Sequence, residues 1–525
     1  MELRPYQEEA VESVFNEWNE GRKKTLLIMA TGTGKTVCFS SVIDREIKDG
    51  KKILVLAHRG ELLEQAQDKL LKNGIESCLE KAESTVLGKG LLDSPNVVVG
   101  SVQSMSGKRL EKFPRDMFDT IVVDEAHHCV SKTYQKIFEY FSNAKVLGVT
   151  ATPSRGDQKN LATFFESTAY EYSLLDGIND NYLSDIEIQR IPLKLDITQV
   201  SINAGDFSSG EVATAIDPYL EEIGDKIIEY CKGRKTVVFT PLIKTSVRLK
   251  GILEKKGIKT AEVNGKSEDR KVVLEEFEKG KYDVMLNSML LTEGWDCPSV
   301  DCIIVLRPTR SFGLYMQMVG RGTRLFEGKK NLLLLDFMWL SKKHDIMNPV
   351  KMIAPSEEIE KLMSDNAFNG NKVNLVDCMN KAEFDLEESM MRRLRENKRN
   401  EFERISSIQF LASLGHFNNL FKEDIYEWEK EKPTKKQLDF IKNKGLEVEG
   451  IYSKGLAKRI IDTIMFRIKK NKSSIKQIKC LSKYHFKNVQ DWSFEEASKM
   501  ITRIQKNRWK VPKGINPFTY NSLTK

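Results

Sequence analysis

KTLLIMATGTGKT, residues 24–36, places a short apolar run directly before a glycine-rich turn and the start of a helix. This order is typical of a phosphate-binding loop, in which main-chain N–H groups and the positive end of the helix surround an anionic phosphate chain. Glycine at positions 32 and 34 lets the backbone approach where a Cβ would clash. Met29 stands where the strict pattern has its first glycine. The residues expected to hold the phosphates are Thr31, Gly32, Thr33, Gly34, Lys35 and Thr36, with Lys35 at the β and γ phosphates and Thr36 on magnesium.

Two adjacent carboxylates follow a second apolar run, TIVVDE at residues 120–125. At the end of a strand beside a phosphate loop, Asp124 could hold magnesium while Glu125 orients and deprotonates an attacking water. An Asp-Glu pair taken alone is usually solvated surface. The preceding apolar strand and the phosphate loop favour the catalytic interpretation. His127, two residues later, could instead satisfy a local hydrogen bond.

Short apolar runs alternate with helix-length segments through the first two thirds of the chain, a pattern that predicts buried parallel strands in βα units. The runs begin near residues 24, 52, 96, 120 and 145, and again near 235, 283, 301 and 331. The predicted fold class is α/β, with two tandem RecA-like doubly wound parallel-sheet domains followed by an α-helical C-terminal region. The expected boundaries are 1–190 for the first domain, 191–215 for a linker, 216–345 for the second domain, 346–431 for a charged helical connector and 432–525 for a basic module.

Composition limits the class of protein. The chain has 525 residues, 40% of them hydrophobic and 30% charged, which matches a multidomain globular protein rather than a disordered or fibrous one. The longest apolar runs are far shorter than the ~18 residues of a membrane span, and the N-terminal residues lack the pattern of an export signal. Eight scattered cysteines without CxxC pairs argue against a disulfide framework and against structural zinc. We therefore expect a cytoplasmic protein that does not bind membranes.

The end of the chain is strongly basic and contains an internal repeat. Residues 432–525 carry 23 Lys and Arg against 7 Asp and Glu, whereas the whole chain has a net charge of only +8. At an offset of 40 residues, TKKQLDFI from Thr434 aligns with SIKQIKCL from Ser474, and both open with the Ser/Thr-x-x-Gln capping box of a helix N-terminus. Each unit is therefore expected to be a helix pair. The residues expected to grip nucleic-acid phosphates are Lys436, Lys476 and Arg508, with Trp492 and Trp509 near enough to stack on bases. The alternative is a solvated lysine-rich surface.

In order along the chain, these residues resemble the superfamily 2 helicases and nucleic-acid translocases, over about residues 3–340. LRPYQ (3–7) resembles the adenine-sensing motif, ATGTGKT (30–36) motif I, and DEAH (124–127) motif II. AHRGELLEQ (57–65) resembles motif Ia, SVQS (101–104) the next strand-contacting motif, and TATP (150–153) motif III. The resemblance implies that Gln7 contacts the base of ATP, that Arg59, Gln65, Ser101 and Gln103 lie near the nucleic-acid backbone, and that His127, Thr150 and Thr152 couple the ATP state to strand grip.

The second half continues the resemblance. VVFTP (237–241) resembles motif IV, TEGWDCPSVD (292–301) motif V, and QMVGRGTR (317–324) motif VI. By this resemblance Thr292 contacts nucleic acid, and Gly294, Asp296 and Gln317 belong to the nucleotide site. Arg321 and Arg324 are implied to reach the γ-phosphate. Two arginines three apart lie on one face of a helix and can neutralise the charge that develops during phosphoryl transfer.

The closest resemblance is to the branch of superfamily 2 that contains RadD, the XPB-type translocases and the type III restriction motor subunits. That branch implies an ATP- and Mg²⁺-dependent DNA helicase or translocase that acts in repair, recombination or replication, with single-strand-binding or recombination proteins as partners. No cysteine quartet follows the motor, unlike in RadD, and no metal-nuclease pattern stands out in the last third. The alternatives are an RNA-directed helicase, and a regulatory or remodelling subunit that uses ATP as a clamp and barely unwinds.

Overall fold

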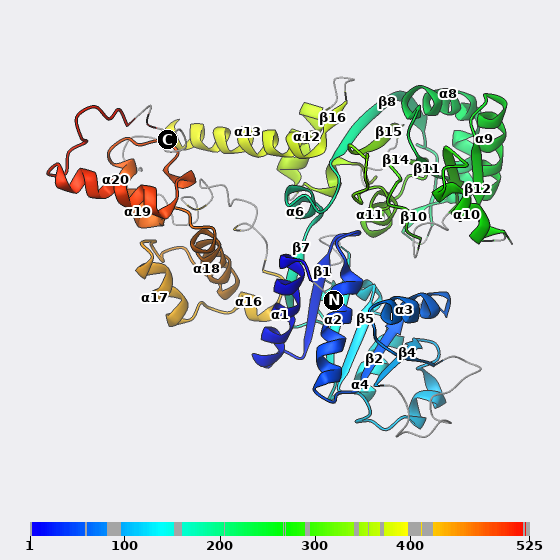
Figure 1. The fold of residues 1–525 in the computed structure, drawn as a ribbon, viewed down its shortest axis with the longest axis horizontal. Coiled ribbons are helices and arrows are strands. Elements are labelled where there is room, and N and C mark those ends of the chain that lie inside the picture. The colour runs from blue at the N-terminus through cyan, green and yellow to red at the C-terminus, as the bar shows by residue number, and fades with distance from the viewer. Residues whose placement is uncertain are drawn as a thin grey trace. The chain divides into compact units, whose positions relative to one another are not determined.

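The chain forms two compact units, Met1–Phe384 and Asp385–Lys525. The structure is a computed structural model (Figure 1). It describes residues 3–57, 60–80, 96–151, 160–203, 205–265, 267, 269–288, 295–340, 346–354, 356–367, 372–396, 411, 420, 424–517 and 520. Among the helices of these residues, none is both long enough and apolar enough to cross a membrane.

The first unit begins with a seven-stranded parallel sheet in the order β3-β4-β2-β5-β6-β1-β7. We call this sheet and its helices the first lobe. Its elements are α1 (Pro5–Asn19), β1 (Lys24–Met29), α2 (Lys35–Lys48), β2 (Ile53–Ala57), α3 (Gly60–Lys72), β3 (Cys78–Glu80), β4 (Val97–Ser101), η2 (Gly107–Lys112), β5 (Thr120–Asp124), η3 (Ala126–His128), α4 (Lys132–Tyr140), β6 (Lys145–Thr150), β7 (Ser167–Tyr172) and α6 (Leu174–Asn179).

The continuous apolar strands of this lobe are buried on both faces. Successive residues of β1 alternate between two cores: Leu26 belongs to the core shared with α4, and Leu27 to the core shared with α1 and α2. Side chains of a strand point to opposite faces in turn, so a run without polar residues requires cover on both sides. The helices supply that cover, which confirms a doubly wound fold.

The second lobe is also a seven-stranded sheet, in the order β12-β13-β11-β14-β15-β8-β16, parallel except for β16. Helices α7, α8 and α9 pack on one of its faces. Its elements are β8 (Ile186–Asp196), β9 (Ile202–Asn203), β10 (Asp206–Phe207), α7 (Ser209–Ile216), η4 (Asp217–Tyr219), α8 (Leu220–Cys231), β11 (Thr236–Phe239), α9 (Ile243–Lys255), β12 (Thr260–Val263), α10 (Arg270–Glu278), β13 (Val284–Asn287), β14 (Cys302–Val305), α11 (Phe312–Val319), β15 (Leu332–Leu340), η6 (Val350–Met352), α12 (Glu357–Ala367), β16 (Val373–Asn374) and α13 (Leu375–Glu396).

The boundaries differ from those expected. Residues 186–196 form β8, which pairs along its whole length with β15, so the second lobe begins before residue 190. The segment 191–215, expected as a linker, holds the end of β8, a short hairpin and α7. Its apolar side chains, including Leu193 and Leu195, are buried in the core of the second lobe. β16 adds an antiparallel strand to β8, so part of the expected connector also belongs to this lobe.

In the part of the second unit that the structure describes, the end of α13 is followed by two helix pairs. α17 (Lys435–Asn443) and α18 (Lys454–Lys469) form one, and α19 (Ile475–Ser482) and α20 (Phe494–Lys506) the other; α16 (Glu427–Lys430) and η9 (Val489–Asp491) are short. Each pair has its own apolar core.

Equivalent positions of the two helix pairs make equivalent contacts. Thr434 and Ser474 each form a capping box with the glutamine three residues later. Gln437 Nε2 then donates to the Lys454 carbonyl at 3.5 Å, and Gln477 Nε2 to the Phe494 carbonyl at 3.0 Å. The glutamine therefore joins the two helices of each pair in the same way.

Candidate functional site

Three strands bring the predicted site residues of the first lobe to one edge of its sheet. β6 lies between β1 and β5, with Ile28 paired to Thr150 and Val149 paired to Asp124. The carboxyl ends of parallel strands lie at a common edge, where ligands of open α/β sheets bind. The phosphate loop, Thr150 and Asp124 therefore meet there.

The phosphate loop has a backbone that depends on glycine. Gly32 and Gly34 have φ angles of 90° and 87°, in the left-handed region, and Gly34 is the N-cap of α2. The Thr33 hydroxyl donates to the Ala30 carbonyl at 2.7 Å, which fixes the turn between them. The loop thus ends at the N-terminus of α2, whose main-chain N–H groups suit an anion.

The first turn of α1 is attached directly to this loop. Tyr6 Oη donates to the Thr33 carbonyl at 2.7 Å, and Gln7 Nε2 donates to the same oxygen at 3.2 Å. The Arg4 N–H donates to Gln7 Oε1 at 3.0 Å, so both ends of the Gln7 amide are held. A Cβ at Gly34 would lie 2.4 Å from Gln7 Nε2, and glycine is needed there for this approach as well as for its φ.

The two carboxylates at the end of β5 have pKa values shifted in opposite directions. Burial raises the pKa of Asp124, and the neighbouring Glu125 raises it further. Burial would also raise the pKa of Glu125, but the hydrogen bond with His127 and the charge of Lys35 outweigh it and lower that pKa to about 2. His127 Nδ1 lies 3.4 Å from Glu125 Oε2. Glu125 is therefore an ionised carboxylate at neutral pH, as a general base must be.

Lys35 lies among charges of both signs. Desolvation lowers the pKa of Lys35, the carboxylates of Glu125 and Asp124 act in the opposite direction, and the Arg321 guanidinium adds to the lowering. A lysine and an arginine held close together in a desolvated place repel each other, and an anion between them would relieve that repulsion. This is the charge arrangement that a phosphate chain requires.

Residues of the second lobe reach the phosphate loop. A Cβ at Gly320 would lie 2.6 Å from Thr31 Cβ. A Cβ at Gly32 would lie 3.5 Å from the Arg324 side chain and 3.6 Å from that of Thr323. The turn after α11 therefore packs on the loop that precedes α2.

The two arginines of this turn are held by the loop of residues 295–298. Arg321 is buried, and its Nη1 donates to the Trp295 carbonyl at 2.6 Å, while Arg324 forms an ion pair with Asp296. Desolvation lowers the pKa of Arg324 to about 10. The expectation that the two arginines share a helix face is wrong, because α11 ends at Val319. Both arginines lie in the turn that begins at Gly320, between α11 and β15. Gln317 is half-buried within α11.

The remaining predicted residues of the motor lie as follows. Ser101 is buried at the end of β4, where its hydroxyl accepts from the Ser104 N–H at 3.0 Å, while Gln103 is exposed. Gln65 lies in α3, but its side chain is outside the described part of the structure. Arg59, Thr152, Thr292 and Gly294 also lie outside the described residues.

Lys436, Lys476 and Arg508 are exposed on the second unit. Lys436 and Lys476 occupy the same helical position in the two pairs, the second residue of α17 and of α19. Trp509 is 54% exposed, but Trp492 is buried in the core of the last helix pair beside Phe486 and Tyr520. The expectation that Trp492 could stack on bases is therefore wrong, because its ring is part of that core.

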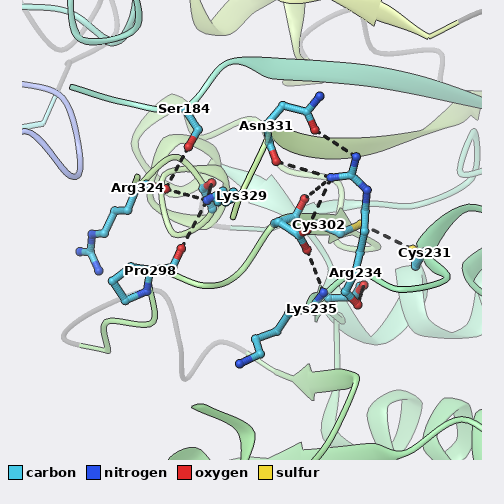
Figure 2. Close-up of polar contacts among 12 residues, drawn as sticks. Ser184, Cys231, Arg234, Lys235, Pro298, Cys302, Arg324, Lys329 and Asn331 are labelled. Carbon is cyan, nitrogen blue, oxygen red and sulfur yellow. Dashed lines mark hydrogen bonds and ion pairs between the residues drawn. The ribbon is translucent and has the colours of Figure 1, made fainter. Parts of the chain in front are cut away.

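Sequence reasoning missed three residues at the site. Tyr6 stacks on Tyr172, with ring centroids 4.1 Å apart and an interplanar angle of 3°. Lys69 of α3 lies close enough to Asp124 to lower the pKa of that carboxyl. Lys329 contacts the turn of the arginines (Figure 2). Tyr6 could have been noticed beside Gln7, but nothing in the sequence indicates that Lys69 or Lys329 folds toward this site.

Comparisons with known proteins match both lobes. Residues 1–155 match the family described as "Type III restriction enzyme, res subunit", and residues 220–325 match "Helicase conserved C-terminal domain". "Putative ATP-dependent helicase IRC3" of Saccharomyces cerevisiae is 30% identical over 380 residues, which are 68% of this chain and 54% of that protein. The type I restriction enzyme EcoAI endonuclease subunit of Escherichia coli is 28% identical over 64% of this chain and 46% of its own length. The chain thus spans about half the length of these relatives.

Solved structures give the same fold. The fragment structure of "a putative HsdR subunit of a type I restriction enzyme" from Vibrio vulnificus has a TM-score of 0.51 at 26% identity, over 64% of each chain. The type ISP restriction-modification enzyme LlaBIII, solved bound to DNA, has a TM-score of 0.53 at 17% identity, over 96% of this chain and 42% of that one. At 17% identity, the similarity to LlaBIII shows a shared fold and nothing more.

Proposed function

The chain belongs to the superfamily 2 helicases and translocases, in the branch of the type III restriction motors, and from this we propose that it is an ATP-driven motor that moves along or unwinds DNA. The observation that carries the proposal is the approach of Gly320 to Thr31, which places the two arginines of one lobe beside the phosphate loop of the other. A site divided in this way makes hydrolysis depend on the arrangement of the lobes, as a motor requires.

The phosphate loop supplies the binding site for ATP. Gly32 and Gly34 let the main chain surround the phosphates, and Lys35 would neutralise the β and γ oxygens. Gln7 and Tyr6, both bonded to the Thr33 carbonyl, lie where a purine base attached to those phosphates could be sensed. Occupancy of the base site would thereby be transmitted directly to the loop.

The residues present also fit a divalent cation. Thr36 and Asp124 offer a hydroxyl and a carboxylate, and Mg²⁺ is commonly bound by one or two protein oxygens together with substrate phosphates and water. A cation would also offset the burial and the neighbouring carboxylate that raise the pKa of Asp124. When bound, magnesium would stabilise negative charge on the phosphates.

Glu125 and the two arginines would perform the hydrolysis. Glu125, ionised and with His127 Nδ1 3.4 Å from its Oε2, would orient a water and accept its proton. Arg321 and Arg324 would neutralise the charge that develops on the transferred phosphoryl group. Both arginines also contact residues 295 and 296, in the segment that resembles motif V, and this gives nucleotide chemistry a route to the nucleic-acid-binding segments.

The basic second unit would add affinity for nucleic acid through phosphates. Lys436 and Lys476, exposed at equivalent helical positions, would contribute contacts that depend on salt and not on base sequence. The DNA assignment is supported by the relatives whose names describe restriction endonuclease subunits. Roles in repair, recombination or replication, with single-strand-binding or recombination proteins as partners, belong to the same proposal. All eight cysteines are free thiols, which suits a reducing compartment such as the cytoplasm.

The test is steady-state ATP hydrolysis without nucleic acid and with single-stranded DNA, duplex DNA, a forked junction and RNA, alongside Lys35→Ala. Stimulation by DNA that disappears in Lys35→Ala is the expected result. Stimulation by RNA alone would favour an RNA-directed helicase. Hydrolysis that no nucleic acid stimulates would contradict the motor, and strand displacement measured beside triplex displacement would separate unwinding from duplex translocation.

A further inference from the structure

The loop after the two arginines folds back onto them through Lys329. Its ammonium donates hydrogen bonds to the carbonyl oxygens of Gly322 at 2.6 Å, Arg324 at 2.7 Å and Pro298 at 3.5 Å. A lysine ammonium can donate three hydrogen bonds and can accept none, so three carbonyls can use its whole donor capacity. Figure 2 shows the Lys329 nitrogen between the main chains of Arg324 and Pro298.

A tight turn places Lys329 there. The Lys329 N–H donates to the Phe326 carbonyl at 3.1 Å, and Gly328 has a φ of 79°, which glycine adopts without strain. The neighbouring Lys330 is exposed, whereas Lys329 is half-buried, although both lie in the same loop. Partial burial removes water from the Lys329 ammonium, which costs free energy. The hydrogen bonds to the three carbonyls offset that cost.

The three carbonyls belong to the two segments that the arginine side chains join. Gly322 and Arg324 lie in the turn that carries the arginines. Pro298 ends the loop whose Trp295 carbonyl accepts from Arg321 and whose Asp296 pairs with Arg324. Lys329 therefore links the main chains of these two segments.

Ser184 also holds this turn, through two hydrogen bonds. Its Oγ donates to the Arg324 carbonyl at 3.0 Å (Figure 2). Its N–H donates to the Thr323 carbonyl at 2.7 Å. The Arg324 carbonyl thus receives two donors, Lys329 Nζ and Ser184 Oγ. A carbonyl held by two donors restrains its peptide plane, and with it the direction in which the arginine side chain leaves the backbone, as supporting hydrogen bonds do for other functional groups.

We propose that Lys329 is a positioning residue for ATP hydrolysis, which holds Arg321 and Arg324 in the orientation presented to the phosphate loop by tying the 322–324 turn to the 295–298 loop. The role rests on the proposed function and acts through the arginines. Burial lowers the pKa of Lys329 to about 8, with Asp301 opposing and Arg324 and Arg234 adding to the lowering, as expected for an ammonium enclosed by protein.

The experiment compares Lys329→Met, which keeps the unbranched side chain as far as Cε and removes the ammonium with its donors, with Lys330→Met as the matched control. Single-turnover ATP hydrolysis with saturating DNA, ATP affinity and melting temperature are measured for each. Lys329→Met should slow hydrolysis by roughly tenfold to a hundredfold, the scale of a misplaced functional group. Its ATP affinity should stay within about twofold of the wild-type value, because the contacts that hold ATP before the reaction are unchanged. Lys330→Met should match the wild type.

A second comparison separates positioning from general support of the fold. In a variant with both Arg321→Ala and Arg324→Ala, adding Lys329→Met should change the single-turnover rate by less than about twofold, because no arginine is left to position. An equal slowing in both backgrounds, or a normal rate in Lys329→Met alone, would overturn the proposal. ATP hydrolysis by the wild-type protein is measured first, with and without nucleic acid. If nucleic acid does not stimulate it, the proposed function itself is overturned, and this outcome is separate from a failure of the Lys329 proposal.

Discussion

Gly320 lies against Thr31: a β-carbon at position 320 would come 2.6 Å from Thr31 Cβ and 2.9 Å from Thr31 Cγ2. The glycine follows the last helical residue before the arginine turn, and the threonine belongs to the phosphate loop. Real Cβ contacts are never this short, so this packing between the two lobes requires glycine. The absent side chain therefore determines how closely the arginines approach the phosphates.

Gly320→Ala should impair hydrolysis, because the added methyl group must push the turn away from Thr31. The Met316 carbonyl oxygen, 2.7 Å from the same Cβ position, blocks the methyl group as well. Displacement of the arginines by about 1 Å should lower kcat by roughly a hundredfold. Gly313→Ala, in α11 with open space around its Cβ position, is the matched control and should keep wild-type activity. Equal kcat values for the two variants in an ATPase assay would show that the close approach is unimportant.

Glu125→Gln should bind ATP and hydrolyse it very slowly. The amide keeps the size of the side chain but cannot accept the proton of water, a loss worth roughly 10²- to 10⁴-fold in rate. Glu139→Gln, on the exposed side of α4, should leave turnover unchanged. Fluorescent nucleotide binding together with phosphate release would test this, and normal phosphate release by Glu125→Gln would remove Glu125 from the role of base.

Asp336 should make the second lobe less stable as the pH rises. Burial raises the pKa of this carboxyl to about 6, with Arg190 opposing, whereas its ordinary value is 3.8. The folded chain therefore binds the proton more tightly, so the stability from this group is full below about pH 4 and is lost as the pH rises through 6. At pH 7.5 the loss is on the order of 2 to 3 kcal/mol.

The check is the melting temperature of Asp336→Asn, which cannot ionise, relative to wild type. The variant should melt several degrees higher than wild type at pH 7.5, with the difference shrinking toward pH 5. Asp283→Asn, at an exposed position of the same lobe, is the matched control for replacing a carboxylate by an amide. A difference that grows as the pH falls would mean that the ion pair with Arg190 outweighs burial.

Replacing Lys436 and Lys476 together by alanine should weaken nucleic-acid binding and its salt dependence. Each phosphate contact contributes about 0.9 to the slope of log affinity against log salt on duplex DNA, so the slope should fall by roughly 1 to 2. Lys430→Ala is the control, because the Lys430 charge is already paired with Glu427 at 2.7 Å. Fluorescence anisotropy at several salt concentrations measures the slope, and an unchanged slope would support a merely solvated lysine surface.

The sequence predicted the fold class because strands buried on both faces, such as β1 and β5, contain uninterrupted apolar runs, LLIM and IVV. β8 escaped this reasoning for a physical reason. Its sequence, IEIQRIPLKLD, mixes apolar and polar residues, and Pro192 interrupts it. Proline cannot donate to a sheet ladder, and here the pairing with β15 shifts register beside it, between Phe337 and Met338. A polar, proline-containing strand has the composition of a linker, which explains the misplaced boundary.

In the candidate site, too, some features could be predicted from the sequence and others could not. The phosphate loop and the two carboxylates are local patterns, and the structure brings them to one sheet edge. Contacts between distant segments, such as Arg321 with the Trp295 carbonyl or Lys329 with the Pro298 carbonyl, depend on how loops fold against each other. Trp492 illustrates the same limit, because an aromatic residue among lysines can either stack on a base or complete a core.

The most direct test of a site completed by both lobes is Arg321→Ala, measured for ATP affinity and for single-turnover hydrolysis in the presence of DNA. ATP should still bind, because the phosphate loop is intact, while hydrolysis should slow by roughly 10³-fold or more, the scale of an arginine finger. Hydrolysis at the wild-type rate would contradict a site completed by both lobes, since the first lobe would then perform the chemistry alone.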